Sequence, residues 1–343
     1  MYNRILVTGG AGFIGSNYVR LMLGQRDDVF IVNLDALTYA GNRDNVREFD
    51  GRANYRFVHG DICDRDLVAS LLREHDIEAI VHFAAESHVD RSIAGAEAFA
   101  RTNVGGTLSM LEAARQHGVK KFLQIGTDEV YGSLGAEGFF TEDTPYHPNN
   151  PYSATKAGAD LLALSFQRTY GLPVVITRTS NNYGPYQFPE KLIPLMITNA
   201  VSGKPLPVYG DGQNVRDWIF VEDNCRALEM VLNHGQVGEV YNIGSDNERK
   251  NIEIVHLICD AVDSNLGLAG EASARRLITY VQDRLGHDRR YATDCAKIRR
   301  ELGWQATVSF EEGMQRTVDW YIANQQWSQR IQTGEYRSES AGA

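Results

Sequence analysis

Two short stretches contain residue types that move protons in enzymes. The stretch GTDEVYG places a hydroxyl and two adjacent acids, Thr127, Asp128 and Glu129, directly after an apolar run. The stretch YSATK places Tyr152 and Lys156 four residues apart, a spacing that puts both side chains on one face of a helix. A lysine ammonium near a phenol favours the phenolate and lowers the tyrosine pKa from ~10 toward neutrality. Such a tyrosine can act as a general base, and two carboxyl groups with separated pKa values can act as an acid and a base. The plainer interpretations are a solvated turn and an exposed Tyr–Lys pair.

Buried strands and amphipathic helices alternate through the first half of the chain and would position these groups. Apolar runs predict the strands, and apolar residues at three- and four-residue spacing between them predict the helices. Gly118 and Gly171 stand where the residue after a helix end is expected. This alternation is typical of parallel βαβ units, so we expect an α/β fold with a Rossmann-like doubly wound parallel sheet. The predicted strands cover residues 4–9, 29–35, 55–61, 78–85, 120–126 and 172–178.

The regular alternation ends after Asn181, where loops rich in Gly, Pro and Asn begin. We expect residues 1–180 to form the doubly wound domain, with its sheet completed by about 215–245 through the stretches DWIFVEDNCRALEMVLNH and EVYNIG. Residues 181–330 would mainly form a smaller C-terminal α/β lobe that binds the substrate. The tail 331–343 carries no core pattern, and we expect it to be disordered.

The composition indicates a soluble globular protein of the cytoplasm. Of 343 residues, 43% are hydrophobic and 23% charged. A formal net charge of -10 argues against a general binder of nucleic acid or membrane surfaces, since both bind basic faces. No apolar run approaches the ~20 residues that span a bilayer. The four cysteines form no CxxC pair and the histidines no ligand pattern, so we expect a reducing compartment and no metal.

The stretch VTGGAGFIGS predicts a dinucleotide site. Gly9, Gly12 and Gly15 follow the first strand and open a helix, where glycine lets the backbone approach a pyrophosphate at the positive helix end. Asp35 ends the second strand, where a carboxylate binds ribose hydroxyls and repels a 2′-phosphate. We therefore expect NAD rather than NADP. Asp61 ends the third strand, where it would reach the adenine amino group or cap the following helix.

With these glycines, Thr127 and the Tyr–Lys pair resemble the extended short-chain dehydrogenase/reductase superfamily. Within it, the Thr-Asp-Glu triplet is the pattern of nucleotide-glucose 4,6-dehydratases. The chain is similar to the dTDP-glucose 4,6-dehydratase family from residue 4 to about 325, with Leu285 standing where that family usually has Pro. The further matching stretches are AAESHVDRSI (84–93), RTSNNYGPYQFPEKLIP (178–194), YGDGQNVRDWIFVEDN (209–224) and DRLGHDRRYA (283–292).

The resemblance implies an NAD-dependent lyase (hydro-lyase) of deoxysugar biosynthesis. It would dehydrate dTDP-glucose to dTDP-4-keto-6-deoxy-glucose by C4 oxidation, elimination of water across C5–C6 and hydride return to C6. Tyr152 would take the 4-hydroxyl proton while Thr127 holds O4, and Lys156 with the positive nicotinamide ring would lower the tyrosine pKa. The C4 ketone makes the C5 proton acidic, so that Glu129 can remove it as the base. Asp128 would protonate the departing 6-hydroxyl as the acid.

The resemblance also implies a wider set of contacts. Arg216 and Arg284 would grip the substrate pyrophosphate, because an acidic protein needs local cations for it. A plainer interpretation is that each of these arginines forms a surface ion pair. Likewise, His287 could be a loop histidine that is hydrogen-bonded to the backbone. On the cofactor side the implied residues are Phe13, Ile14, Leu37, Thr38, Ile62, Ala84, Ala85, Ser87, Thr102 and Asn182, beside the glycines, Asp35, Asp61, Tyr152 and Lys156. On the substrate side they are Ser87, Thr127, Asn181, Lys191, Leu192, Pro207, Tyr209, Arg216, Asn251, Arg284, His287 and Tyr291.

Two helical stretches, TLSMLEAARQ and GADLLALSFQ, carry more apolar surface than one sheet face requires. The resemblance implies that they pair across a two-fold axis in a homodimer, although internal packing is an alternative. Three other functions share parts of the pattern. A dehydratase acting on UDP- or CDP-glucose would keep every group. A nucleotide-sugar 4-epimerase has no use for Asp128 or Glu129, and a non-catalytic NAD sensor needs neither these acids nor Tyr152.

Overall fold

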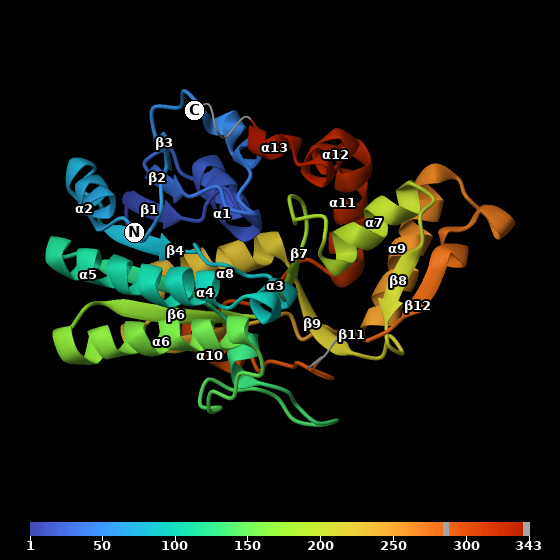
Figure 1. Ribbon diagram of the computed structural model, residues 1–343. Helices are drawn as coiled ribbons and strands as arrows, with labels where there is room; N and C mark the ends of the chain where they lie inside the picture. Colours follow the sequence, from blue (N-terminus) through green and yellow to red (C-terminus); the bar gives the residue numbers. More distant parts are fainter. Residues whose placement is uncertain (284–287, 339–343) are drawn as a thin grey trace.

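The computed structural model, which describes residues 1–283 and 288–338, is built around a seven-stranded sheet (Figure 1). Every neighbouring pair of strands in this sheet is parallel. The predicted doubly wound α/β fold is therefore confirmed, with each of the six predicted strands in this sheet. In spatial order the strands are β10 (Val240–Ile243), β6 (Val174–Thr179), β5 (Lys121–Thr127), β4 (Ala79–His82), β1 (Arg4–Thr8), β2 (Phe30–Asp35) and β3 (Tyr55–His59).

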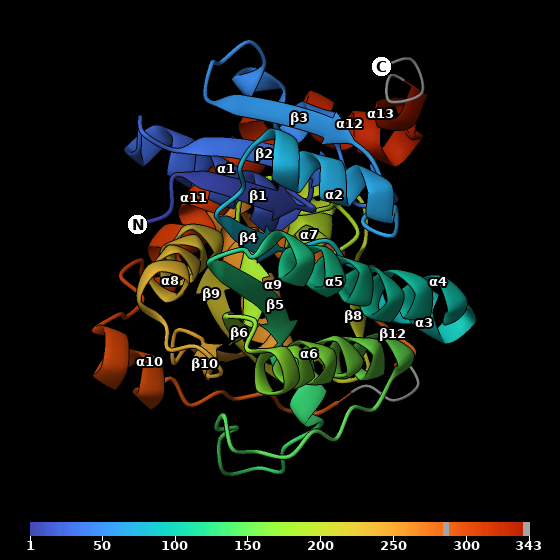
Figure 2. The same ribbon diagram turned by 90° about the vertical axis from the view of Figure 1, so that its left-hand side faces the viewer.

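Helices cover both faces of the sheet, which is why its strands are apolar nearly throughout (Figure 2). On one face, α1 (Phe13–Gln25) and α8 (Val221–His234) enclose one buried apolar cluster. On the other, α2 (Arg65–Glu74), α5 (Thr107–His117) and α6 (Pro151–Tyr170) enclose a second. Among the described residues, no helix has both the length and the apolar character needed to cross a membrane.

Two of the glycines end helices as predicted. Gly118 follows α5 with φ 79°, and Gly171 follows α6 with φ 69°. This left-handed backbone is unfavourable for residues with a Cβ atom, so glycine stops each helix and turns the chain toward the next strand. The exits of α5 and α6 therefore lead directly into β5 and β6.

A smaller lobe lies beyond the carboxyl ends of the main strands. Its core is a third apolar cluster beneath three helices, α7 (Leu192–Val201), α9 (Asn251–Leu266) and α11 (Phe310–Ala323). Figure 1 draws this lobe on the right, beside the main sheet. Its strands are β7 (Asn181–Tyr183), β9 (Val215–Phe220) and β11 (Glu248–Lys250) in one sheet, and β8 (Leu206–Tyr209) with β12 (Ile278–Val281) in another.

The prediction that DWIF adds a strand to the main sheet is wrong. These residues end β9, which pairs with β7 and β11 in the smaller lobe. The buried Asp217 gives the reason, because its carboxylate accepts N–H groups from Ser245 and Asn247 at 3.1 and 2.8 Å and so ties β9 to the segment before β11. EVYNIG does form β10 of the main sheet, and α10 (Ala296–Leu302) lies beside it.

The prediction of a disordered tail is wrong for residues 331–338. They continue α12 (Gln325–Thr333) and form α13 (Glu335–Ser338). Tyr336 is buried, and its hydroxyl donates to the main-chain oxygen of Tyr39 at 2.6 Å. This burial depends on a partner near the opposite end of the chain, which no local pattern shows. Residues 339–343 lie outside the described residues.

Candidate active site

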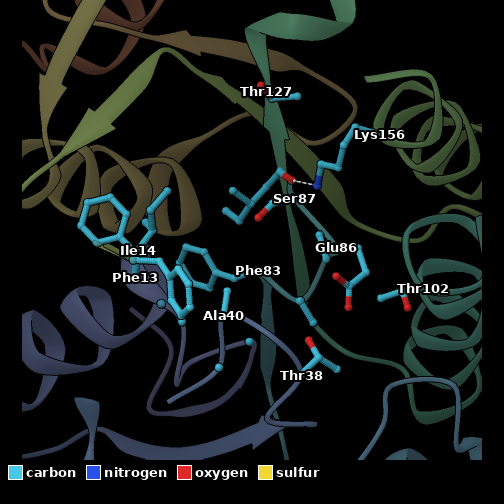
Figure 3. Close-up of a pocket in the computed structure, with 18 of the residues that line it drawn as sticks. Phe13, Ile14, Thr38, Ala40, Phe83, Glu86, Ser87, Thr102, Thr127 and Lys156 are labelled. Carbon is cyan, nitrogen blue, oxygen red and sulfur yellow. Dashed lines mark hydrogen bonds between the residues drawn. The ribbon is translucent and has the colours of Figure 1, made fainter. Parts of the chain in front are cut away.

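A cavity of about 350 Å³ follows the carboxyl ends of six strands of the main sheet. The order of the strands reverses between β1 and β4, and open α/β sheets bind ligands at such a switch point. In Figure 3, Phe13 and Ile14 lie on one side of this cavity, Thr127 and Lys156 lie toward its other end, and Ser87 lies between them. Residues predicted from the sequence that line it are Gly9, Gly12, Phe13, Ile14, Gly15, Asp35, Thr38, Asp61, Ile62, Ala84, Ala85, Ser87, Thr102, Thr127, Asp128, Glu129, Tyr152, Lys156, Asn181, Asn182 and Lys191.

The glycines after β1 pack so closely against neighbouring main chain that no side chain fits at their positions. A Cβ atom on Gly9 would lie 2.7 Å from the main-chain nitrogen of Ala84, and one on Gly15 would lie 2.3 Å from the carbonyl oxygen of Gly9. Helix α1 begins after Gly12, and no side chain caps the N–H groups of its first turn. Those groups carry the positive end of the helix dipole and suit a pyrophosphate. These main-chain N–H groups therefore fit the pyrophosphate of NAD.

Asp35 is fixed at the end of β2 by two main-chain donors. Its carboxylate accepts the N–H groups of Leu37 and Ala11, both at 2.8 Å. Burial raises the Asp35 pKa, while these two hydrogen bonds lower it. Leu37 itself does not line the cavity, and its backbone is left-handed with φ 50°. The strained turn at Leu37 thus directs the Asp35 carboxylate toward the glycine loop, where a ribose would lie.

Asp61 is not a helix cap, so that interpretation is wrong. The residue that caps α2 is Asp64, whose side chain accepts the N–H of Leu67 at 3.0 Å. The Asp61 carboxylate lines the cavity instead and accepts the N–H of Cys63 at 2.9 Å and the guanidinium of Arg101 at 2.6 Å. Both Asp61 and Asp64 precede the apolar pattern of α2, and sequence spacing did not distinguish them.

Residues 100–106 form a π-helix that brings further groups to the cavity. Such turns are rare and are frequent at functional sites. Arg101 lines the cavity, and Asn103 exchanges hydrogen bonds with the main chain of Glu86 at 2.8 and 3.0 Å. Asn103 also donates to Thr155 at 3.0 Å, which fastens the loop after β4 to α6. Sequence reasoning missed this π-helix, because its stretch resembles the start of an ordinary helix.

Other residues of the lining were also missed. Tyr39 and Ala40 follow Asp35 closely, so their nearness to the expected ribose acid was an available signal. Gln187 and Phe188 come from the loop after β7, whose composition predicted a loop but not its direction. The remaining members of this group are Leu34, Ala36, Gly41, Gly60, Phe83, Glu86, Ile125, Gly126, Thr179 and Ser180.

The end of β5 delivers the hydroxyl and the two acids through one tight turn. The Thr127 hydroxyl accepts the N–H of Glu129 at 3.3 Å and donates to a carboxylate oxygen of Asp128 at 3.4 Å. The turn ends at Gly132, where φ is 89° and a Cβ atom would lie 2.4 Å from the carbonyl oxygen of His147. Glycine is therefore required at that position, and the turn holds the two acids side by side at the cavity.

The two acids have raised pKa values. Asp128 is 3% exposed, and burial, followed by the charges of Glu129 and Asp217, raises its pKa to about 8. The Oδ2 atom of Asp128 has no hydrogen-bond partner among the described residues. Burial also raises the pKa of Glu129, while the charges of Lys191 and Arg216 lower it. Asp128 is thus protonated at neutral pH, which is the state that a general acid needs.

Lys156 lies one turn beyond Tyr152 on α6. This helix begins at a capping box in which Asn150 accepts the N–H of Ser153 at 2.9 Å. The ammonium of Lys156 is buried and donates to the carbonyl oxygen of Ile125 at 2.6 Å, the dashed line in Figure 3. Burial lowers the Lys156 pKa. The lysine is therefore tied to β5, close to the turn that carries the two acids.

The described side chains on balance raise the Tyr152 pKa, and its lowering by Lys156 together with the positive nicotinamide ring stays a prediction. Burial raises the pKa of the phenol, and the charge of Glu129 raises it further, whereas an interaction with the Thr127 hydroxyl lowers it. Burial disfavours the charged form of any acid, and it outweighs the other contributions here.

The predicted substrate residues divide into three groups. Asn181 and Lys191 line the cavity beside Ser87 and Thr127. Arg284 and His287 lie outside the described residues, as does Leu285, the position at which the sequence departs from the family pattern. Those that are described but do not line the cavity are Leu192, Pro207, Tyr209, Arg216, Asn251 and Tyr291.

The interpretation of Arg216 as a surface ion pair is wrong. Its side chain is buried, and its guanidinium lies 4.4 Å from the ring centre of Tyr291. It donates to the carbonyl oxygens of Val215 and Asp288 at 2.7 and 2.8 Å. Its charge lowers the pKa values of both active-site acids. Arg216 therefore provides a fixed, desolvated cation beside Glu129, at the border between sheet and lobe.

A doubly wound sheet with a glycine loop, an acid ending β2 and a Tyr–Lys pair on α6 defines an extended short-chain dehydrogenase/reductase. Comparison with known proteins gives the family within this class. A family model described as GDP-mannose 4,6 dehydratase matches residues 6–317. The dTDP-glucose 4,6-dehydratase of Xanthomonas campestris pv. campestris is 54% identical over 98% of each chain. The chain belongs to the dTDP-glucose 4,6-dehydratase family.

Solved structures of this family have the same fold. The dTDP-glucose 4,6-dehydratase DesIV from Streptomyces venezuelae, crystallised with NAD and the ligand TYD bound, is 51% identical with a TM-score of 0.89. The corresponding Bacillus anthracis enzyme, crystallised with NAD, is 50% identical with a TM-score of 0.88. Each match covers 96% of this chain and 99% of the other. The likeness thus extends over both the main sheet and the smaller lobe.

Proposed function

We propose that the protein dehydrates dTDP-glucose to dTDP-4-keto-6-deoxy-glucose as an NAD-dependent hydro-lyase. The observation that carries this proposal is that Asp128 and Glu129 share one cavity with Tyr152 and Lys156. A 4-epimerase uses the Tyr–Lys pair but needs no acid and base for the loss of water. When bound, NAD supplies the acceptor for a hydride from C4 and the donor that later reduces C6.

The residues at the end of β5 and on α6 act first on the 4-hydroxyl of glucose. Tyr152 takes the proton of that hydroxyl, and Thr127 holds its oxygen. Because burial raises the Tyr152 pKa, the phenol needs a neighbouring positive charge to ionise. Lys156 supplies an ammonium on the same helix face, held in place by the Ile125 carbonyl. The strand–helix contact therefore sets the distance between base and substrate.

The two acids then remove water across C5–C6. A ketone at C4 makes the C5 proton acidic, which is why oxidation comes before elimination. Glu129 removes that proton as a carboxylate, because the charges of Lys191 and Arg216 oppose the rise in its pKa that burial causes. Asp128 is protonated at neutral pH because its pKa is about 8, and it gives its proton to the departing 6-hydroxyl. Both roles follow from environment, since the residues are neighbours in one turn.

The binding contacts of the ligands are part of the same proposal. The first turn of α1 and the glycine loop hold the cofactor pyrophosphate, and Asp35 holds the adenosine ribose. Asn181 and Lys191 contact the substrate from the cavity wall. We also assign the substrate pyrophosphate to Arg216, whose buried guanidinium lies behind the cavity wall, 4.4 Å from the ring centre of Tyr291. An acidic protein can bind this anionic substrate because these positive charges are local.

An assay of the purified protein with dTDP-glucose tests this function. We expect the alkali-induced absorbance of a 4-keto-6-deoxy sugar, with dTDP-glucose preferred in a panel that includes UDP-, CDP- and GDP-glucose. Ketosugar formation from only another nucleotide-glucose would show that the enzyme recognises a different nucleobase. Interconversion of a glucose and a galactose nucleotide without ketosugar would identify an epimerase, and no ketosugar from any nucleotide-glucose would contradict the dehydratase proposal.

We also propose a homodimer in the cytoplasm. Helices α5 and α6 lie side by side on one face of the sheet (Figures 1 and 2), and Leu161 on α6 is 53% exposed although it is apolar. Burying that face against a second copy would remove apolar surface from water. Sedimentation analysis of the wild type and of Leu161→Glu tests the dimer, since we expect the charged variant to be monomeric. The four free cysteines support a reducing compartment, which fractionation of the source cell tests.

A further inference from the structure

The two last helices of the chain lie against the segment that wraps the cofactor site. Both Figure 1 and Figure 2 draw α12 and α13 beside the N-terminal part of the chain, although the two are separated by the whole sequence. The contacted segment is residues 36–45, which begins directly after Asp35 and includes five residues of the cavity wall. Among the described residues, none on α12 or α13 lines the cavity itself. Their effect on the site must therefore pass through other residues.

The first contact leads to the glycine loop through Asn45. The indole N–H of Trp327 on α12 donates to the side-chain oxygen of Asn45 at 2.9 Å. The side-chain nitrogen of Asn45 in turn donates to the carbonyl oxygen of Ala11 at 2.9 Å. The same carbonyl also accepts the N–H of Asn42 at 3.0 Å. Because Asn45 is 2% exposed, water cannot readily replace Trp327 in this chain of hydrogen bonds.

The second contact holds the opposite end of the segment. The Tyr336 hydroxyl of α13 donates to the carbonyl oxygen of Tyr39 at 2.6 Å. The Tyr336 ring lies 6.2 Å from that of Phe188, which lies 5.3 Å from the ring of Tyr39. Both Tyr39 and Phe188 line the cavity. Tyr336 thus supports two cavity residues that come from different loops.

An ion pair and the preceding helix complete the attachment. Arg330 lies 3.0 Å from Asp44, between the two hydrogen-bond contacts. On α11, the Tyr321 hydroxyl donates to the carbonyl oxygen of Gln187, which also lines the cavity. The three helices therefore contact both residues 36–45 and the loop after β7 that carries Gln187 and Phe188.

We propose that α12 and α13 form a C-terminal clasp that holds residues 36–45 against the glycine loop, with Trp327 and Tyr336 as positioning residues that set how fast a bound dinucleotide leaves. The reaction regenerates its cofactor within each turnover, so a slow release of NAD costs the enzyme nothing. The inference rests on the proposed function in taking NAD as the occupant of the cavity.

The rate of NAD exchange tests the clasp. Protein loaded with NAD is freed of excess cofactor and mixed with isotopically labelled NAD, and the labelled fraction of bound cofactor is followed by mass spectrometry. We expect Tyr336→Phe and Trp327→Phe each to speed the exchange about three- to tenfold, the factor for one lost hydrogen bond of ordinary strength. Because the two contacts hold separate ends of the segment, we expect the factors to multiply in the double variant.

Two controls separate positioning from a general loss of structure. Gln329→Ala changes an exposed residue of the same helix and should leave the exchange rate unchanged. At saturating NAD, the kcat of the double variant should stay within about twofold of the wild type, since the clasp touches no reacting atom. Tyr336→Phe removes a single hydroxyl, so it provides a readout even where the double variant does not fold.

The proposal is overturned if the folded variants exchange NAD within about twofold of the wild-type rate. It is also overturned if Gln329→Ala speeds exchange equally, or if kcat at saturating NAD falls in proportion to the exchange rate. The readout is bound NAD and not sugar turnover, so a wrong substrate assignment leaves it intact. Failure of the wild type to bind NAD at all would instead contradict the proposed function.

Discussion

The ammonium of Lys156 lies 2.6 Å from the carbonyl oxygen of Ile125, so α6 is attached to β5 two residues before Thr127. This hydrogen bond holds together two parts of the site that are distant in sequence. The helix supplies the Tyr–Lys pair, and the strand supplies the hydroxyl and the acids. Burial lowers the Lys156 pKa, while the Asp160 carboxylate one turn further along α6 raises it. Lys156 therefore supplies a positive charge to the site and also a hydrogen bond that links α6 to β5.

Replacement of Lys156 by Met should abolish the first chemical step. The variant loses the ammonium that favours the Tyr152 phenolate and also the attachment to the Ile125 carbonyl. We expect ketosugar formation to fall by about 10²–10⁴-fold, the range for loss of general acid–base catalysis. Lys204→Met, at an exposed lysine, is the matched control. Turnover by Lys156→Met at the rate of that control would contradict the role of the lysine.

The raised pKa of Asp128 predicts the pH dependence of dehydration. Asp128 is an acid in its protonated form and loses its proton as the pH rises through about 8. Turnover at saturating substrate should therefore decline above that pH, because the departing hydroxyl no longer receives a proton. A rate profile that shows no decline through pH 8 would contradict the assignment of Asp128 as the acid.

The same pKa predicts how stability changes with pH. The folded-state pKa of Asp128, about 8, exceeds its ordinary value of 3.8, so the folded protein holds this proton more tightly than the unfolded chain. The stabilisation is complete at pH values below the ordinary pKa and is lost as the pH rises toward 8. Asp128→Asn removes this loss. Its thermal midpoint, measured at several pH values against the wild type, should gain most near pH 8, and an equal gain at all pH values would contradict the linkage.

Replacement of Glu129 by Gln should separate oxidation from elimination. The amide keeps the size of the side chain but cannot remove the C5 proton. With dTDP-glucose present, we expect the absorbance of reduced nicotinamide to appear while ketosugar formation falls about 10²–10⁴-fold. Glu137→Gln, at an exposed loop position, should behave as the wild type. Normal dehydration by Glu129→Gln would show that another group is the base.

The features that could be predicted are those with a local physical cause. Continuous apolar runs mark strands that are covered on both faces, and Gly118 and Gly171 mark helix ends because their backbones are left-handed. The position of the two acids could also be predicted, because they directly follow a predicted strand and parallel strands direct their carboxyl ends to one edge of the sheet. The stretch GTDEVYG alone indicates two adjacent acids, Asp128 and Glu129, at that edge.

The features that could not be predicted depend on partners far along the chain. The Asp61 carboxylate accepts a hydrogen bond from Arg101, and the Tyr336 hydroxyl donates one to the main chain of Tyr39. No local sequence pattern indicates either pairing. The destination of β9 depends on hydrogen bonds that Asp217 makes with another loop. The protonation of Tyr152 depends on its burial, which spacing along a helix does not give. Each of these requires the folded arrangement.

The buried pair of Asp160 and Arg178 should matter for stability more than any exposed ion pair. The Arg178 guanidinium is 3.1 Å from Asp160, and both side chains are almost fully buried. Asp160→Asn leaves the guanidinium uncompensated between the rings of Tyr131 and Tyr146. Breaking such a pair costs about 3–5 kcal/mol, so we expect the free energy of unfolding in urea to fall by that amount.

The half-exposed pair of Asp260 and Arg275, at 2.6 Å, provides the comparison, and Asp260→Asn should cost less than about 1 kcal/mol because water screens the charges. The double variant Asp160→Asn with Arg178→Met removes both buried charges and should recover part of the stability lost in Asp160→Asn alone. If Asp160→Asn costs no more than Asp260→Asn, the buried guanidinium is compensated by its two tyrosines without the carboxylate. A double variant less stable than the sum of its single changes would show that the charges themselves, and not their mismatch, hold α6 against β6.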